Sequence, residues 1–162
     1  MADPMLVLEA HDRYGLPLAV DAAGDHLATG GFDGSLATWR LPAGDRVAVA
    51  DGHAQSVNCG ALASTGELVT GGTDAAVDRW SLPDLSAVGT LSGHTDTVAG
   101  LASHQTEPLV ASASYDTTVR LWDLESAGEA RVLEGHERNV TTVAFVEEWL
   151  VSGGLGEAAQ VW

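Results

Sequence analysis

The chain has 162 residues, of which 45% are hydrophobic and 19% charged, and its 23 acidic and seven basic side chains give a formal net charge of −16. This length suits one domain or an array of small repeats, and the apolar content excludes a disordered chain. The excess of carboxylates disfavours partners that carry phosphate groups, so we expect neither nucleic-acid binding nor binding to an anionic membrane.

The sequence contains no basic patch followed by an apolar stretch at its start, and no run of 18 apolar residues. We therefore expect no secretory signal and no transmembrane helix, and we assign the protein to the cytoplasm. Cys59 is the only cysteine, which excludes an internal disulfide and a cysteine-based zinc site. We expect no metal site and no cofactor.

Four copies of one pattern follow each other along the chain. Histidine recurs every 41 or 42 residues, and tryptophan every 40 to 42. A serine or threonine lies ten residues before each of these tryptophans, and an aspartate lies six residues before the first three, where the fourth copy has Gly156. The positions are His11, Thr29, Asp33 and Trp39; His53, Thr70, Asp74 and Trp80; His94, Ser112, Asp116 and Trp122; and His136, Ser152 and Trp162. A constant period of this length predicts a repeat architecture.

Each copy is expected to form four short strands. In the third copy these are residues 98–103, 109–113, 118–124 and 130–133. Small residues and an aspartate at 114–116 predict the tight turn between the second and third strands. Apolar residues occur on both faces of the third strand, so one sheet does not bury its own surface and the copies must stack. The repeat boundaries are about 11–51, 52–92, 93–134 and 135–162.

The repeated residues resemble those of the WD40-repeat family. The third copy is the most similar, with Gly93-His94, Ser112-Ala113-Ser114-Tyr115-Asp116 and Val119-Arg120-Leu121-Trp122-Asp123. The other copies are degenerate, with Trp39-Arg40 and Trp80-Ser81 in place of the Trp-Asp pair. The resemblance covers essentially the whole chain. It implies an all-β fold, a single WD40-type β-propeller domain over residues 1–162 in which each copy is a four-stranded antiparallel blade.

The two ends of the chain are out of phase with the blades. Val7-Leu8-Glu9 matches Val132-Leu133-Glu134 in the fourth strand of the third copy, and the last copy contains only three strands. We therefore expect an N-terminal strand over residues 5–9 that completes the last blade. Three arrangements stay open: a tight four-bladed ring, a homodimer that closes an eight-bladed ring, and a truncated fragment of a seven-bladed protein without independent function.

Histidine, serine or threonine, and aspartate are the residue types of a hydrolase triad. A nucleophile is needed once per site, however, whereas this set recurs in three copies at the same spacing. In the WD40 family these residues and the tryptophan form a buried hydrogen-bonded tetrad within a blade. We therefore assign all of them to the structure and expect no catalytic residue. The alternative is a propeller-based hydrolase or esterase.

The resemblance also implies a binding surface. In this family the narrower, top face binds peptides through the residue before the turn aspartate and through residues that flank a first-strand valine. Carried over by position, the candidates are Tyr14, Phe32, Asn58, Thr73, Tyr115, Asn139, Thr141 and Leu155. Exposed aromatic and apolar groups at such positions are typical of interfaces. We therefore expect a non-catalytic interaction scaffold that binds a protein or peptide.

The net charge has two interpretations. An acidic docking face would favour a basic peptide or partner protein. Alternatively, carboxylates scattered over the surface keep a protein hydrated in a salty cytoplasm, where salt screens their mutual repulsion. The acids are distributed along the chain and lysine is absent, which resembles proteins of extreme halophiles.

Overall fold

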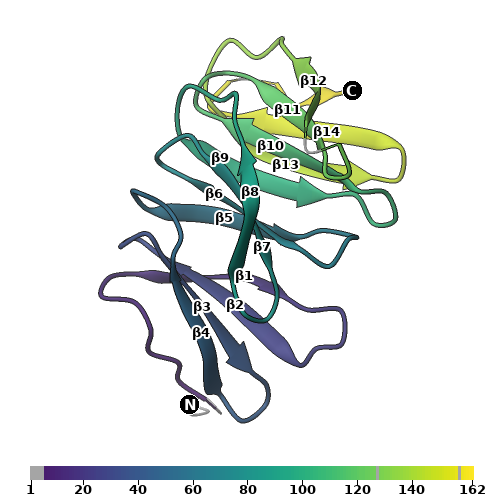
Figure 1. The fold of residues 1–162 in the computed structure, drawn as a ribbon. Coiled ribbons are helices and arrows are strands. Elements are labelled where there is room, and N and C mark those ends of the chain that lie inside the picture. Colours follow the sequence, from purple (N-terminus) through teal and green to yellow (C-terminus); the bar gives the residue numbers. More distant parts are fainter. Residues whose placement is uncertain (1–5, 127, 157) are drawn as a thin grey trace, which may run out of the picture.

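The computed structural model describes residues 6–126, 128–156 and 158–162, and within these ranges the chain forms β-strands and turns without helices. Figure 1 shows four sheets that follow one another in sequence order, from the purple first blade to the yellow last one. The blades consist of β1 (Gly15–Val20), β2 (His26–Gly31), β3 (Ser35–Arg40) and β4 (Asp45–Asp51); β5 (Val57–Leu62), β6 (Leu68–Gly72), β7 (Val77–Ser81) and β8 (Ser86–Leu91); β9 (Val98–Ser103), β10 (Leu109–Ser114), β11 (Val119–Asp123) and β12 (Gly128–Leu133); and β13 (Val140–Val146), β14 (Trp149–Gly154) and β15 (Gln160–Val161).

The strands of each blade pair antiparallel in the order of the sequence. Two irregularities recur from blade to blade. All four blades have a register shift between the first and second strands, and the three four-stranded blades have another between the third and fourth strands. Such shifts bend a strand and increase its twist. The fold class predicted from the repeat is confirmed: the protein is all-β and built from WD40-type propeller blades.

Apolar clusters lie between consecutive blades. Between the first and second blades, Ala28 and Leu36 pack with Val57, Leu68 and Trp80. The next two junctions are built in the same way, from Val69, Val77, Val98, Val110 and Trp122, and from Ala111, Val119, Val140, Val143 and Leu150. Each blade therefore contributes one face to the cluster before it and the other to the cluster after it, as stacked repeats require.

The last blade and the N-terminal segment differ from the prediction. The last blade has three strands, and residues 6–9 lie in no strand, while Met5 falls outside the described residues. The N-terminal end lies beside the first blade, where a Cβ on Gly44 would be 2.7 Å from the Leu6 side chain. Because the blades advance in one direction, the two ends of the chain lie at opposite ends of the arc (Figure 1). The expected N-terminal strand does not reach the last blade of its own chain, and the tight four-bladed ring is not formed.

The two ends of the blades carry different connections. We call the top face the end at which the second strand turns into the third and at which one blade leads into the next. The opposite end, the bottom face, carries the turns between the first and second strands and between the third and fourth. No helix among the described residues is long and apolar enough to span a membrane.

Candidate interaction face and hydrogen-bonded tetrads

The third blade contains a continuous chain of hydrogen bonds. The indole N–H of Trp122 donates to the hydroxyl oxygen of Ser112 at 2.8 Å, and this oxygen lies 2.7 Å from His94 Nε2. On the other side of the ring, His94 Nδ1 lies 2.6 Å from Asp116 Oδ2. A neutral imidazole satisfies every group in this series of hydrogen bonds, because the serine hydroxyl then donates to Nε2 and the Nδ1–H donates to the carboxylate.

The first and second blades repeat this arrangement. In the second blade, Thr70 accepts from Trp80 Nε1 at 2.9 Å, and the His53 ring lies 2.9 Å from both Thr70 Oγ1 and Asp74 Oδ1. In the first blade a serine is inserted in the chain: Ser35 Oγ lies 2.7 Å from His11 Nδ1 and donates to Asp33 at 2.6 Å, while Thr29 accepts from Trp39 at 3.0 Å.

The turn aspartates also hold the connection that enters each blade. In three blades the aspartate accepts a hydrogen bond from the backbone N–H that follows the tetrad histidine. The bonds are 2.7 Å from Asp12 to Asp33, 2.8 Å from Ala54 to Asp74 and 3.1 Å from Thr95 to Asp116. Each carboxylate therefore ties the top-face turn of its blade to the connection beside it.

These contacts keep the aspartates ionised. Burial alone would raise the pKa of Asp116, but hydrogen bonds from Thr118 and His94 outweigh it and lower this pKa to about 2. In the same way, burial would raise the pKa of Asp74, but hydrogen bonds from His53 and Ala54 lower this pKa. The tetrad hydroxyls have no exposed surface in the second and third blades. A substrate has no access to these two hydroxyls, so the tetrads of the second and third blades do not present a nucleophile.

The fourth blade has an incomplete tetrad. His136 Nε2 lies 2.7 Å from Ser152 Oγ, which accepts from Trp162 Nε1 at 2.9 Å. Gly156 stands in place of the aspartate, so this position offers no carboxylate to the second ring nitrogen. Burial lowers the pKa of His136, since the protonated ring is less well solvated there.

The residues before the turn aspartates share one backbone contact. In each blade the backbone N–H of this residue donates to the carbonyl of the residue directly before the first strand, at 2.9 Å in all four cases. The donor and acceptor pairs are Phe32 and Tyr14, Thr73 and Ser56, Tyr115 and Thr97, and Leu155 and Asn139. The repeat thus places one candidate side chain per blade at the same level of the top face.

The candidate side chains differ in exposure. Tyr14 is 78% exposed and Phe32 42%, and their rings meet edge to face at 5.8 Å. Tyr115 and Leu155 are also exposed. The polar candidates lie deeper: the Asn58 amide donates to Thr73 Oγ1 at 3.1 Å and to the Val98 carbonyl at 3.2 Å, and Asn139 and Thr141 are half-buried. The apolar groups therefore form the accessible part of this face.

Acidic side chains surround these groups. Among the described residues at the top face, the exposed carboxylates belong to Glu9, Asp12, Asp33, Asp51, Asp96, Glu134 and Glu137, whereas the exposed guanidinium groups are those of Arg13 and Arg138. The potential at this face is therefore negative.

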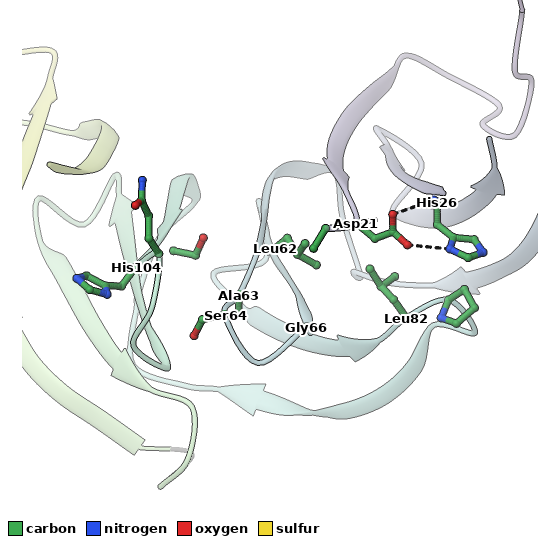
Figure 2. A pocket seen from close by; sticks show the side chains of 12 residues that line it. Asp21, His26, Leu62, Ala63, Ser64, Gly66, Leu82 and His104 are labelled. Carbon is green, nitrogen blue, oxygen red and sulfur yellow. Dashed lines mark hydrogen bonds and ion pairs between the residues drawn. The ribbon is translucent and has the colours of Figure 1, made fainter. Parts of the chain in front are cut away.

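The bottom face contains a pocket of about 580 Å³ between the first three blades. Figure 2 shows that the Asp21–His26 pair lies at one end of it and that Ser64 lies beyond Leu62. His26 Nδ1 is 2.9 Å from Asp21 Oδ2, and this bond lowers the pKa of the carboxyl. Ser64 instead donates to the Glu107 carbonyl at 2.7 Å, and no hydroxyl in the described part of the chain bonds to His26. The pocket therefore holds an Asp–His pair to which no hydroxyl of the described residues is hydrogen-bonded, although Ser64 and Ser103 also line the pocket.

Other reactive groups are held within the fold. The Cys59 sulfur lies 3.8 Å from the Gly71 and Val98 carbonyls, and burial raises the pKa of its thiol to about 12. The thiolate is the nucleophilic form, and a raised pKa disfavours it near neutral pH. Over residues 6–126, 128–156 and 158–162, no three histidine, cysteine or acidic side chains form a group that could hold a metal ion.

Sequence reasoning did not single out two features. The Asp21–His26 pair lies outside the repeat, and its only signal is an aspartate five residues before a histidine at a strand start. Trp149 is 60% exposed at the start of β14. The sequence does mark Trp149, because it is the one tryptophan of the five that does not follow the repeat spacing.

Comparisons with known proteins agree with the blade structure. The family model described as WD domain, G-beta repeat matches residues 85–123. Nuclear distribution protein nudF of Aspergillus niger is 38% identical over 60 residues, and human WD repeat-containing protein 37 is 40% identical over 63. These matches cover 36% and 37% of this chain, and 14% and 13% of the two relatives.

Two solved structures match nearly the whole chain. The structure titled "Structure of U3-55K" has a TM-score of 0.91 and the one titled "Crystal structure of RRP9 WD40 repeats" a TM-score of 0.90, both at 26% identity. Each match covers 97% of this chain, and 51% and 50% of the respective solved chains. The chain thus spans about half of these solved chains and a much smaller part of the curated relatives.

Proposed function

Since the chain belongs to the WD40-repeat family, we propose that it is a non-catalytic scaffold that binds a peptide or a partner protein on its top face. The observation that carries this proposal is the fourfold backbone contact at that face. It holds an exposed apolar side chain in three of the four blades: Phe32, Tyr115 and Leu155. Exposed aromatic groups in fixed positions bury a large area at a low entropic cost when a partner binds.

The charge around these groups determines the class of partner. The favoured partner is a basic peptide or a basic protein surface that also carries apolar residues. Its apolar residues would contact Phe32 and Tyr115, and its cationic groups would lie near the surrounding carboxylates. Such charge complementarity accelerates association and excludes acidic competitors. It also makes the affinity dependent on salt, because the carboxylates at this face are exposed.

Two observations support the absence of catalysis in this proposal. Every tetrad hydroxyl is engaged with a tryptophan N–H and a histidine ring, and those of the second and third blades are fully buried. The Asp21–His26 pair of the bottom face has no hydroxyl hydrogen-bonded to it among the described residues. Activity of the purified chain on an activated ester would contradict this part of the proposal.

The binding test uses a library of short peptides in which basic, neutral and acidic members carry the same apolar residues. We expect the basic members to bind and the acidic ones not to bind, as measured by fluorescence anisotropy. Phe32→Ser and Tyr115→Ser should each weaken binding about tenfold or more, as loss of a central aromatic contact does. Val88→Ser is the matched control, because Val88 is 47% exposed on the outer strand β8 of the second blade. Equal binding of basic and acidic members, or equal loss in the control, would refute the proposal.

We also propose that the protein works in the cytoplasm of a cell with high internal salt. The support is the net charge of −16 with no lysine in the chain. The thermal midpoint should then rise from dilute buffer to molar salt, since screening reduces the repulsion among carboxylates. A midpoint that does not change with salt would oppose this assignment.

A further inference from the structure

The pocket on the bottom face has the size of a ligand site, and it is separate from the top face. Its volume of about 580 Å³ lies within the range of roughly 300–1,000 Å³ that is common for ligand pockets. It is formed by the turns that follow β1, β5 and β9 and by the turn between β7 and β8. Figure 2 shows Asp21, His26 and Leu82 at one end, His104 at the other, and Leu62 between them. Three consecutive blades therefore build this pocket together.

Hydrogen bonds between the blades fix the walls of this pocket. The Ser64 hydroxyl donates to the Glu107 carbonyl at 2.7 Å, which joins the bottom turns of the second and third blades. The Thr38 hydroxyl donates to the Pro83 carbonyl at 2.7 Å, which joins the first blade to a turn of the second. The walls are thus held in place before a ligand binds, and a preformed site reduces the entropic cost of binding.

A partly exposed carboxylate lies at one end of the pocket. Asp21 Oδ1 accepts from the backbone N–H groups of Asp25 at 2.8 Å and His26 at 3.1 Å, and Oδ2 lies 2.9 Å from His26 Nδ1. The hydrogen bond from the His26 ring lowers the pKa of this carboxyl, so it is ionised. A carboxylate has about four acceptor positions, so these three bonds leave one for a ligand. The donors carry no full positive charge while the imidazole is neutral, and the charge of Asp21 is then available to a cation.

The middle of the pocket is apolar. Leu62, Ala63 and Leu82 line this part. Ala63 belongs to the apolar cluster between the second and third blades, and Leu82 packs against the cluster between the first and second. Lysine and arginine bury their methylene stems along such surfaces while the charged head remains in contact with water or a carboxylate.

The charged residues around the pocket are mainly acidic. Asp25 and Asp84 are exposed and directly adjoin lining residues. No arginine lines the pocket, and the chain has no lysine. Arg40 lies between His26 and Asp45 in the register of the first blade, outside the lining. The pocket therefore complements a positive charge carried on an aliphatic stem.

We propose that this pocket binds a lysine or arginine side chain from a basic segment of another protein. The stem of that side chain packs on Leu62 and Leu82, and its cationic head pairs with Asp21. This is a second binding surface beyond the top face. It recognises one cationic side chain, whereas the top face presents aromatic and aliphatic groups. Because the two faces are opposite ends of the blades, a segment in this pocket leaves the top face free.

The test uses two capped pentapeptides of glycine, one with a central lysine and one with norleucine in its place. The two peptides share the aliphatic stem and differ in charge, and neither carries an aromatic residue. Binding is followed by backbone amide NMR shifts, in the lowest salt that keeps the chain folded. We expect the lysine peptide to shift the amides of Ala22, Ala63 and Gly66 and to bind about tenfold or more tightly than the norleucine peptide. No shifts with the lysine peptide, or equal affinity of the two peptides, would overturn the proposal. Tighter binding of norleucine would do the same, and would indicate an apolar ligand.

Two neighbouring exposed alanines supply a matched pair of variants. Ala22 lines the pocket and Ala23 does not. Ala22→Arg places a competing cation in the pocket and should weaken binding of the lysine peptide about tenfold or more, whereas Ala23→Arg adds the same charge to the same turn and should bind like the wild type. Asp21→Asn keeps a side-chain oxygen for the turn but removes the charge, and should also weaken binding about tenfold. Equal affinities of the two arginine variants would overturn the assignment to this pocket.

A top-face variant separates this proposal from the first one. Phe32→Ser should leave the binding of the lysine peptide unchanged, because Phe32 lies at the opposite end of the first blade. Loss of binding in this variant would overturn the pocket proposal and place the peptide on the top face. Failure of the lysine peptide to bind the wild type would not affect the top-face test, which depends on peptides with apolar residues.

Discussion

The third and fourth blades contain the same histidine, serine and tryptophan but differ in what surrounds them. The third blade has Asp116 and a neighbouring blade on each face, and Trp122 is 1% exposed. The fourth has Gly156 instead and only one neighbour within the chain, and its Trp162 is half-buried. The hydrogen bonds within a blade therefore form without the aspartate and without a second neighbour. Comparing the two blades therefore allows the contribution of the aspartate and that of the second neighbouring blade to be measured separately.

The largest effect is expected from the tryptophan at the centre of this comparison. Trp122→Ala removes a buried side chain from the cluster between the second and third blades, and such a cavity costs about 3–5 kcal/mol of unfolding free energy. Trp162→Ala should cost less, because its side chain is only half-buried. Urea titration in molar salt at one protein concentration measures both. Equal losses would show that neighbouring blades contribute nothing to the difference.

The aspartate should have the next largest effect. Asp116→Ala leaves His94 Nδ1 and the Thr95 N–H without their carboxylate, which costs about 1–3 kcal/mol. Asp84→Ala removes the same charge from an exposed turn in the second blade and should change stability by less than about 0.5 kcal/mol. An Asp116 variant as stable as the Asp84 variant would mean that the carboxylate does not support the blade.

Acid should remove the same contribution without a change in covalent structure. The pKa of Asp116 falls from 3.8 to about 2 on folding, so its contribution to stability is complete above pH 4 and is lost as the pH falls through 2. Asp116→Asn does not titrate. The difference in unfolding free energy between the wild type and this variant should therefore shrink from pH 5 to pH 2. A constant difference over this range would contradict the lowered pKa.

The smallest effect is a gain in the fourth blade. A side chain at position 156 meets no other atom within 4 Å of its Cβ, so Gly156→Asp has room to supply the missing acceptor for His136. One additional hydrogen bond of this kind contributes about 0.5–1.5 kcal/mol. Gly156→Ala is the control for the loss of glycine flexibility in the unfolded chain. If the two variants are equally stable, the aspartate does not complete the tetrad.

The blade architecture could be predicted from the sequence because few residues determine its period. Expected strands at 98–103 and 130–133 correspond to Val98–Ser103 and Gly128–Leu133. The spacing of ten residues from the tetrad hydroxyl to the tryptophan is the same in all four blades because the indole N–H donates to that hydroxyl, and it survives even where Asp is replaced by Gly156. Such spacing is visible in a single sequence.

Features that depend on the relation between blades were harder to predict. The strand expected at residues 5–9 was assigned by its sequence, but whether its partner edge lies in the same chain depends on how far four blades turn. The Asn58–Thr73 bond joins a side chain of β5 to one in the turn after β6, 15 residues apart, and no local pattern marks it. Trp149 is 60% exposed, and the repeat pattern does not mark its position.

The tryptophans give each blade its own spectroscopic label. Trp39, Trp80, Trp122 and Trp162 each donate an indole proton to a hydroxyl of their own blade, and they occur once per blade. Their indole protons should exchange with solvent only when the respective blade opens. Trp149 lies largely in water and should exchange freely. Five indole resonances would thus follow the opening of four blades against one freely exchanging reference in a single spectrum.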